Sequence, residues 1–201
     1  MSHSTAVWMD PAKAAEDLVG WISEQDFSAN NNFTVAVYQG NDLVISKVGG
    51  ITEKAAATGR ILAYIRENSM HVGRKIYAAK AFATLDGPVS NHAEMCILAA
   101  CGASNVNFIK CTSPNCKFCK ATLKAYGVNN ANADGPDGKS QIGWRHPFLQ
   151  VSYGTALASR EADQLAELSG YNQAKEIAGA PVHGQPASSA PKGELLLLLS
   201  G

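Results

Sequence analysis

The sequence lacks an excess of charge of either sign. Its 201 residues include 17 lysines and arginines and 17 aspartates and glutamates, so the formal net charge is zero. A protein without a global positive field is not drawn as a whole onto a polyanion. This balance excludes a uniformly basic nucleic-acid-binding protein.

Long apolar runs and a secretory leader are also missing. No purely apolar run approaches the roughly 18 residues that a membrane-spanning helix needs, and the run of leucines at 195–199 is far shorter. The N-terminal residues do not show the basic stretch and then apolar stretch that mark a signal peptide. These absences predict a cytoplasmic protein with no membrane partner, and they leave open delivery to a target cell by another route.

Aromatic residues make up only 7% of the chain and charged residues only 17%, whereas 46% of the residues are hydrophobic. This composition is enough to form a buried core, and a chain of this length usually forms one domain. We expect a single domain at 1–178 and a Pro-, Gly-, Ala- and Ser-rich tail at 179–201 that ends in the leucine run. The leucines could form an added edge strand or a docking peptide, but packing on the protein's own core is the favoured interpretation.

The cysteines are not spread along the chain as a disulfide framework would be. All five lie within 24 residues, at Cys96, Cys101, Cys111, Cys116 and Cys119. An odd number in a tight cluster fits metal or thiol chemistry in a reducing compartment better than disulfides.

Helix and strand signals alternate along the chain and predict an α/β fold. Helices are expected at 11–23, 53–66, 92–101, 116–126 and 159–178, and strands at 33–38, 42–46, 106–110 and 148–153. The segment 75–83 could be a third strand or the end of a longer helix, because the spacing of its apolar residues does not distinguish the two periods. Two loop-to-helix junctions, which precede the helices at 92–101 and 116–126, carry the unusual side chains.

These junctions contain the ligands expected of a catalytic zinc site. His92 begins the sequence His-Ala-Glu, and the sequence Cys-Lys-Phe-Cys follows after 21 residues, with Cys116 and Cys119 at its ends. One neutral imidazole and two thiolates give a tetrahedral zinc ion three protein ligands and leave the fourth position for water. Two cysteines three residues apart at a helix start lie on one face, and the positive helix end favours their thiolate form.

Glu94 lies two residues after His92, where it can reach water at the metal without being a ligand. Zinc lowers the pKa of its water from about 15.7 to about 7. A carboxylate beside it can then pass a proton to a ring nitrogen and to a leaving amine. This combination is the chemistry of hydrolytic deamination.

The pattern resembles the signature of the zinc-dependent cytidine deaminase superfamily, His-x-Glu followed by Pro-Cys-x-x-Cys, over about residues 33–126. The resemblance implies an α/β fold that is a three-layer α/β/α sandwich with a mixed central sheet. It also implies one Zn²⁺ per chain, bound by His92, Cys116 and Cys119, with Glu94 as the general acid/base.

The chain departs from this signature at one position, where Asn115 separates Pro114 from Cys116. The insertion leaves the ligand spacing unchanged, so it bears on the role of Pro114 and on the local loop shape.

A histidine as first ligand is similar to the branch of the superfamily that acts on nucleotides and on bases within DNA or RNA. The resemblance therefore implies conversion of cytosine to uracil in single-stranded nucleic acid, or in duplex DNA after base flipping. The short core and the loop-rich C-terminal third are similar to bacterial toxin-type deaminases, for which an immunity protein is an expected partner. Residues 71–126 hold 7 basic and 2 acidic side chains, which fits either a local polyanion track or a solvated helix face. The oligomeric state stays open.

Candidate substrate contacts lie near both junctions and in one later segment. Before the first junction they are Asn91, Ser90 and Thr84, which can hydrogen-bond a sugar or a base edge, although Asn91 is equally placed to cap the helix. The second junction adds Ser113, Pro114 and Asn115. The later segment adds Trp144 and His146 beside Arg145, where an aromatic ring and a cation could stack on and bind a nucleotide.

Other readings of the motif stay open. The enzyme could act on a free nucleoside or nucleotide or on an adenine-type base, or the chain could be an inactive zinc-stabilised binding module. Glu94 argues against an inactive module, since structural zinc has no use for that carboxylate. Cys111 could replace a ligand, or it could join a four-cysteine structural site completed by Cys96 or Cys101. Those last two are more simply small buried hydrophobic residues.

Overall fold

The helices and strands alternate along the chain, as the sequence predicted. The computed structural model describes residues 10–29, 31–82, 91–132, 144–148 and 193–201. The α-helices are α1 (Pro11–Ser23), α2 (Ala56–Glu67), α3 (Ala93–Cys101) and α4 (Lys117–Ala125). The strands are β1 (Phe33–Tyr38), β2 (Asp42–Lys47), β3 (Lys75–Ala79), β4 (Val106–Cys111), β5 (Asn129–Asn130) and β6 (Leu195–Ser200).

Local sequence signals explain where the helices begin. Asp10 accepts a hydrogen bond from the Ala12 N–H at 2.9 Å, and Pro11 occupies the first position of α1. Helix α2 begins three residues later than predicted. The turn before it is closed by hydrogen bonds to the Thr52 carbonyl from the Ala55 N–H at 3.3 Å and from the Thr58 hydroxyl at 2.8 Å. The open segment 75–83 forms strand β3 rather than the end of a helix.

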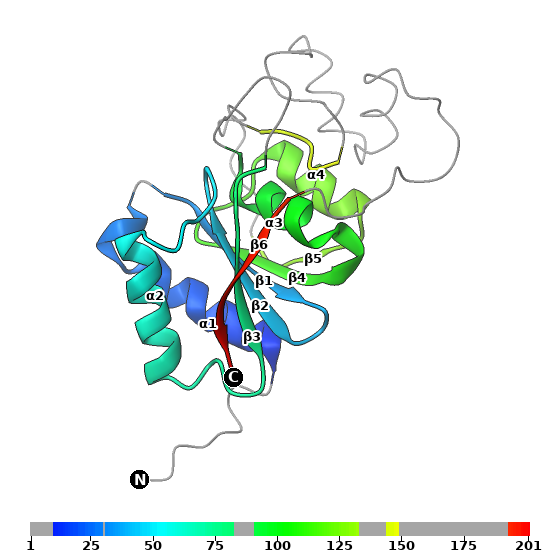
Figure 1. Ribbon diagram of the computed structural model, residues 1–201. Helices are drawn as coiled ribbons and strands as arrows, with labels where there is room; N and C mark the ends of the chain where they lie inside the picture. The colour runs from blue at the N-terminus through cyan, green and yellow to red at the C-terminus, as the bar shows by residue number, and fades with distance from the viewer. Residues whose placement is uncertain (1–9, 30, 83–90, 133–143, 149–192) are drawn as a thin grey trace, which may run out of the picture.

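The six strands form one mixed sheet in the order β5-β4-β1-β2-β3-β6 (Figure 1). Strand β1 is antiparallel to both of its neighbours, β2 and β4. The outer pairs β2–β3 and β4–β5 are parallel, and β6 closes the edge antiparallel to β3. The predicted hairpin therefore lies at the centre of the sheet, with the strand that precedes α4 directly beside it.

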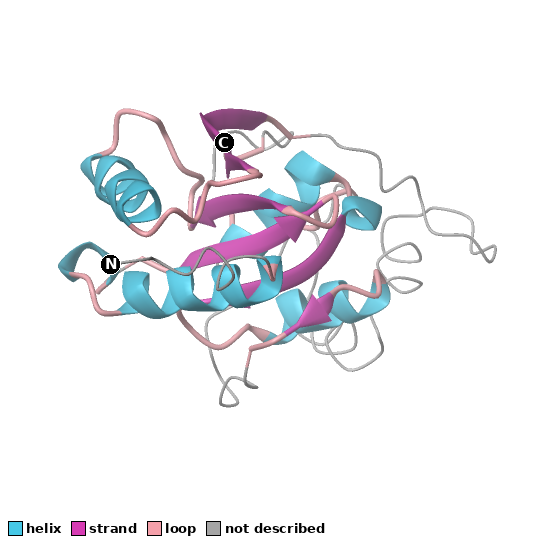
Figure 2. Ribbon diagram, turned by 90° about the horizontal axis from the view of Figure 1, so that it is seen from below, coloured by secondary structure: helices cyan, strands magenta, loops and turns pink. Residues whose placement is uncertain are grey.

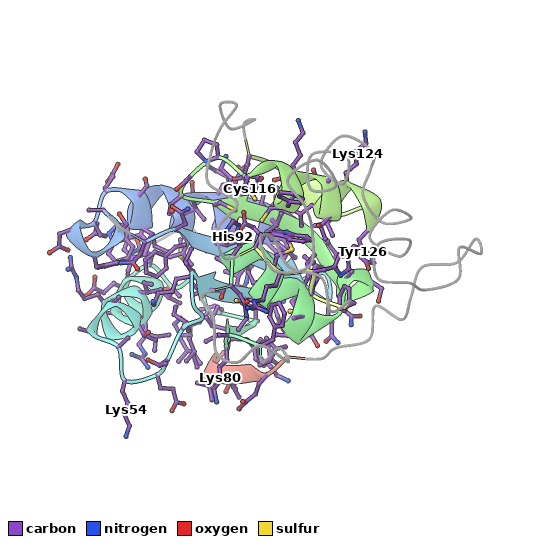
Figure 3. All side chains as sticks on the ribbon, turned by 90° about the horizontal axis from the view of Figure 1, so that it is seen from above. Lys54, Lys80, His92, Cys116, Lys124 and Tyr126 are labelled. Atoms are coloured by element: carbon purple, nitrogen blue, oxygen red, sulfur yellow. The ribbon has the colours of Figure 1, made fainter. Side chains whose placement is uncertain are left out.

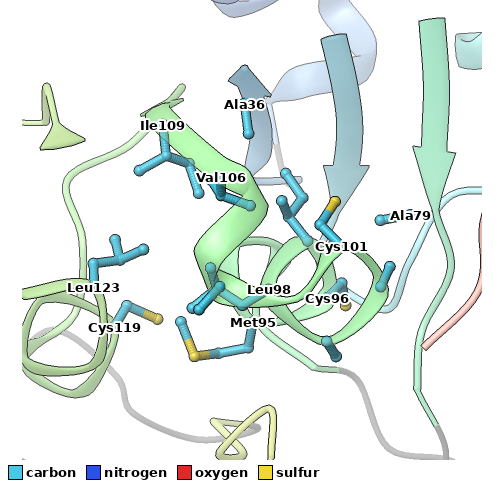
Figure 4. Packing of buried hydrophobic residues seen from close by; sticks show 14 of the residues in the cluster. Ala36, Ala79, Met95, Cys96, Leu98, Cys101, Val106, Ile109, Cys119 and Leu123 are labelled. Carbon is cyan, nitrogen blue, oxygen red and sulfur yellow. The ribbon is translucent and has the colours of Figure 1, made fainter. Parts of the chain in front are cut away.

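Two hydrophobic cores lie on opposite faces of this sheet. Because successive strand residues point to opposite faces, Val35 and Val37 pack with α1 and α2, while Ala36 packs with α3 and α4. Figure 2 shows helices on both sides of the strands. All nine residues of α3 are buried, and Figure 4 shows Met95 and Leu98 within this core. The prediction of an α/β/α fold with a mixed sheet is confirmed.

The leucine run at the end of the expected tail belongs to the sheet, where it pairs with β3. Leu196, Leu198 and Leu199 pack against the core on the α1 and α2 side. Just before β6, the Lys80 N–H donates to the Glu194 carbonyl at 3.1 Å, and the two side chains form an ion pair at 2.6 Å. The favoured interpretation that this segment packs on its own core is confirmed, and it does so as an edge strand.

Several expected features lie outside the described residues. They are the helix at 159–178, most of the strand at 148–153, and residues 179–192 of the expected tail. Within the described part of the chain, no helix has the length and apolar character required to cross a bilayer.

Gly50 provides a test of how tightly the sheet packs beside the first junction. Its φ is +77°, and a Cβ at this position would lie 2.1 Å from the Ala81 backbone nitrogen. We expect Gly50→Ala to lower the free energy of unfolding by about 2–4 kcal/mol, because it adds a steric clash to an unfavourable backbone conformation. Urea unfolding monitored by circular dichroism measures the change.

Gly59, which is exposed within α2, is the matched control. A Cβ there meets nothing within 4 Å, so Gly59→Ala should raise the free energy of unfolding by about 0.5–1 kcal/mol through better helix propensity. Equal effects of the two substitutions would contradict the close approach at Gly50.

Candidate metal centre

The two junctions place their metal-ligand candidates at helix N-termini. His92 is the N-cap residue of α3, with an extended backbone at φ −61° and ψ 141°. Cys116 is the N-cap residue of α4, and its Sγ accepts a hydrogen bond from the Cys119 N–H at 3.4 Å. Helix α3 packs mainly on β2 and β1, and α4 packs beside β5. Both helices therefore cover the same face of the sheet, which brings the two caps together.

His92, Cys116 and Cys119 converge on one point. The His92 Nδ1 atom lies 3.3 Å from Cys119 Sγ and 3.4 Å from Cys116 Sγ, and the ligand atoms of the three residues all lie within 4.8 Å of one another. Figure 3 shows His92 beside Cys116. Both sulfurs are buried, and the imidazole is half-buried.

This donor set fits a metal ion, and its chemistry suits zinc. Ligands at the usual zinc distances of about 2.0–2.3 Å lie about 3.3–3.8 Å apart in a tetrahedron, close to the separations of His92 Nδ1 from the two sulfurs. One nitrogen and two sulfurs are typical zinc ligands, and three of them leave one position open. Among the residues that the structure describes, this is the only such group of histidine, cysteine and acidic side chains.

Glu94 lies beside this group but is not part of it. It occupies the first turn of α3 and is only 7% exposed. Its Oε1 accepts a hydrogen bond from Asn115 Nδ2 at 2.5 Å. The carboxylate is therefore held beside the loop that carries Cys116.

The two thiols of the group have opposite pKa shifts. A hydrogen bond from Cys119 lowers the pKa of Cys116 to about 5, with further help from His92 and against the effect of burial. Burial, followed by the neighbouring Cys116, raises the pKa of Cys119 well above its usual value. In the metal-free protein the pair therefore holds one thiolate at neutral pH, and that thiolate is on the N-cap residue of α4.

The metal-free protein should show this thiolate in its ultraviolet absorbance. We expect a thiolate signal at pH 7 that disappears as the pH falls through about 5, because Cys116 becomes protonated there. Cys116→Ser should remove the signal, whereas Cys101→Ser should keep it, since burial raises the pKa of Cys101 to about 12. A wild-type signal that first appears near pH 9 would contradict the assignment.

Cys111 lies close to the site but has other partners. Its Sγ receives hydrogen bonds from Thr34 Oγ1 at 3.2 Å, Asn132 Nδ2 at 3.3 Å and Asn115 Nδ2 at 3.5 Å. It is not a member of the metal group, so the alternative that it replaces a ligand is not supported. Sequence reasoning missed Thr34 and Asn132, which are far from the motif along the chain and carry no spacing signal.

The alternative of a four-cysteine structural site is likewise not supported among the described residues. All five cysteines are free, and neither Cys96 nor Cys101 belongs to the metal group. Figure 4 shows both on the side of α3 that faces the strands, while Cys119 lies on α4. Both are fully buried, which confirms them as small buried hydrophobic residues, and this burial raises the pKa of each thiol to about 12.

The substrate candidates before the first junction are only partly described. Asn91 is fully buried, and its Nδ2 donates to the Phe82 carbonyl at 2.9 Å. The alternative that Asn91 caps α3 was wrong, because His92 is the N-cap residue and Asn91 Oδ1 has no hydrogen-bond partner among the described residues. Ser90 and Thr84 lie outside the described residues.

The candidates at the second junction differ in exposure. Pro114 is exposed, Ser113 is half-buried and donates a hydrogen bond to Asn32, and Asn115 is buried against Glu94. The residue that departs from the family signature is thus the one that touches the predicted catalytic carboxylate.

Trp144 and His146 do not present their rings to solvent. Trp144 is fully buried, with its ring centroid 4.8 Å from that of Phe118. His146 is 3% exposed, and its Nδ1 accepts a hydrogen bond from the Phe148 N–H at 3.1 Å. Both rings pack among core aromatics, and their stacking on a nucleotide stays a prediction.

The basic side chains of residues 71–126 do not gather in one patch. Arg74 is buried, and Lys80 is paired with Glu194 beside β6. Figure 3 shows Lys80 and Lys124 at opposite ends of the molecule. Lys120 and Lys124 are exposed on α4, the helix that carries Cys119.

The chain was compared with protein-family models, with curated proteins and with solved structures, and no match was found in any of the three.

Proposed function

We propose that this protein is a zinc-dependent hydrolytic deaminase that converts cytosine to uracil in nucleic acid. The observation that carries the proposal is the convergence of His92, Cys116 and Cys119 with a buried Glu94 that stays outside the ligand group. Three ligands and a free carboxylate are what hydrolytic deamination requires, because the reaction needs an activated water and a proton carrier.

His92, Cys116 and Cys119 would hold the zinc ion, which when bound supplies a Lewis acid that lowers the pKa of water. Glu94 accepts a proton from the attacking water at a carboxylate oxygen and donates it to the ring nitrogen next to the amino-bearing carbon. A second transfer through the same carboxylate protonates the leaving amino group. One water and one cytosine thus give one uracil and one ammonia.

A purely structural zinc site is less well supported. Structural zinc sites have four protein ligands, whereas the group within the described residues has three. A buried structural carboxylate usually has a cationic partner that offsets its desolvation. Glu94 receives its hydrogen bond from the amide of Asn115 and is not paired with a cation among the described residues, which favours a role in proton transfer.

The positions of the described lysines and arginines bear on the choice between two substrate classes. Lys120 and Lys124 on α4 provide a local contact for a phosphate backbone, and a base in single strands is accessible without unstacking. The burial of Arg74 and the pairing of Lys80 specifically favour a second candidate, deamination of a free nucleoside or nucleotide. Nucleic acid binding on this surface should be weak and strongly salt-dependent.

The state of the thiols supports a reducing compartment such as the cytoplasm. All five cysteines are free, and a zinc site of two thiolates is lost when its sulfurs form disulfides.

The experiment that tests the proposal uses zinc-loaded protein with several substrates and a Glu94→Ala control. The substrates are single-stranded DNA, duplex DNA, RNA and free cytidine, each offered with an adenine-containing counterpart, and the products scored are uracil, hypoxanthine and ammonia. We expect Glu94-dependent uracil from a single-stranded substrate. Product from free cytidine alone would favour the second candidate, and no Glu94-dependent ammonia from any substrate would overturn the proposal.

A further inference from the structure

Asn115, the residue inserted before Cys116, makes the closest polar contact to Glu94. It lies in the loop that precedes α4, and only 5% of its surface is exposed. Its Nδ2 donates to Glu94 Oε1 at 2.5 Å and lies 3.5 Å from Cys111 Sγ. Both hydrogens of the amide nitrogen therefore have an acceptor.

The orientation of this amide follows from the chemistry of its neighbours. An ionised carboxylate can only accept hydrogen bonds, so the nitrogen rather than the oxygen of Asn115 must face Glu94. The Oδ1 atom has no hydrogen-bond partner among the described residues. A buried, unpaired amide oxygen costs free energy. The orientation of Asn115 therefore makes the hydrogen bond to the Glu94 carboxylate and leaves the Asn115 oxygen without one.

The loop that carries Asn115 is fixed to the central strand β1. The Thr112 N–H donates to the Phe33 carbonyl at 2.9 Å, and the Phe33 N–H donates to Thr112 Oγ1 at 3.0 Å. Ser113 adds a hydrogen bond to Asn32, the residue before β1. The amide of Asn115 is therefore anchored to the sheet rather than to a free loop.

Cys111 Sγ is the second hydrogen-bond acceptor of the Asn115 amide. Thr34 on β1 and Asn132 after β5 both direct their polar hydrogens at Cys111 Sγ, and the backbone N–H of Cys111 donates to Asn132 Oδ1 at 2.7 Å. The sulfur is thereby fixed as the second acceptor for Asn115. Side-chain hydrogen bonds thus run from the sheet through Asn115 to the carboxylate of Glu94.

We propose that Asn115 is a positioning residue that holds Glu94 by Oε1 and leaves the second carboxylate oxygen for the transferred proton. A glutamate at a helix start has three rotatable side-chain bonds, and its carboxylate oxygen is itself a potential zinc ligand. The hydrogen bond from Asn115 restricts the rotation of the Glu94 side chain and occupies Oε1, since it ties the carboxylate to the loop before α4. The catalytic meaning of this contact depends on the proposed deaminase function.

Asn115→Ala tests the effect on turnover. We expect kcat to fall by about 10–100-fold, because without this hydrogen bond the Glu94 carboxylate spends less time in the orientation that transfers the proton. KM should change by less than about threefold, and zinc content should stay at about one per chain. Asn115→Asp, which keeps the shape but loses both donors and faces Glu94 with a second carboxyl group, should lower kcat further. Asn105→Ala removes a similar half-buried hydrogen bond, to the Cys101 carbonyl, and should leave kcat unchanged.

A nuclear magnetic resonance measurement tests the contact itself, independently of activity. The side-chain amide signal of Asn115, identified by its loss in Asn115→Ala, should shift in Glu94→Ala, in which Asn115 is intact. If the signal does not move, the positioning contact is absent and the inference is overturned, whatever the Asn115 variants do.

The two proposals fail in different ways. Active wild-type protein whose kcat survives Asn115→Ala overturns the positioning role and leaves the deaminase function standing. Inactive wild-type protein with a Glu94-dependent amide shift overturns the deaminase function, while the hold of Asn115 on Glu94 is supported. Lower kcat together with the amide shift supports both.

Discussion

Replacing Glu94 by glutamine is expected to lower kcat for deamination by about 10²–10⁴-fold, with zinc content and fold unchanged. Glutamine has the same shape, and its side-chain oxygen can still accept the hydrogen bond that Asn115 Nδ2 makes to Glu94. It cannot take up and release a proton at neutral pH. The substitution therefore separates the proton carrier from the architecture around it, which Glu94→Ala does not. Steady-state kinetics on the best substrate, with zinc measured in the same sample, gives the result.

Glu16→Gln is the matched control for this substitution. Glu16 is exposed on α1, on the opposite face of the sheet from the metal group, and its replacement should leave kcat and zinc content unchanged. If Glu94→Gln retained more than about a tenth of the wild-type kcat, another group would be the proton carrier and the proposed role of Glu94 would be wrong.

The parts of this protein that were predictable from sequence are those with local signals. Asp10 and Pro11 mark the start of α1, and Gly102 ends α3 with a φ of +76°. The metal group is predictable for the same reason, because Cys116 and Cys119 are three residues apart and His92 is an N-cap at the neighbouring junction. Only the approach of the two helix ends had to be supplied by the fold.

The parts that sequence reasoning missed depend on contacts between distant segments. A run of leucines has no period that distinguishes a tail from a strand, and β6 is defined only by its pairing with β3, more than 100 residues earlier. The hydrogen bond from Asn115 to Glu94 also joins residues that are distant along the chain. In the sequence, Asn115 is visible only as an extra residue between Pro114 and Cys116. The packing of Trp144 on Phe118 is a further contact of this kind, since no local pattern in the sequence links the two residues.

Cys116→Ser is expected to abolish zinc binding without disrupting α4. Serine is a preferred N-cap residue, and its hydroxyl can accept the hydrogen bond that Cys116 Sγ receives from the Cys119 N–H. A neutral hydroxyl is a poor substitute for a thiolate ligand, so zinc should fall from about one per chain to near zero after dialysis.

The thermal response to a chelator distinguishes loss of zinc from loss of fold. Zinc bound only to the folded state stabilises it by mass action, so a chelator should lower the Tm of the wild-type protein and leave the Tm of Cys116→Ser unchanged. Cys101→Ser is the matched control, because Cys101 is fully buried in α3 outside the metal group. It should lower the Tm through a buried hydroxyl yet keep one zinc and the chelator response. Retention of zinc by Cys116→Ser, or two zinc ions per wild-type chain, would show that the metal has other ligands.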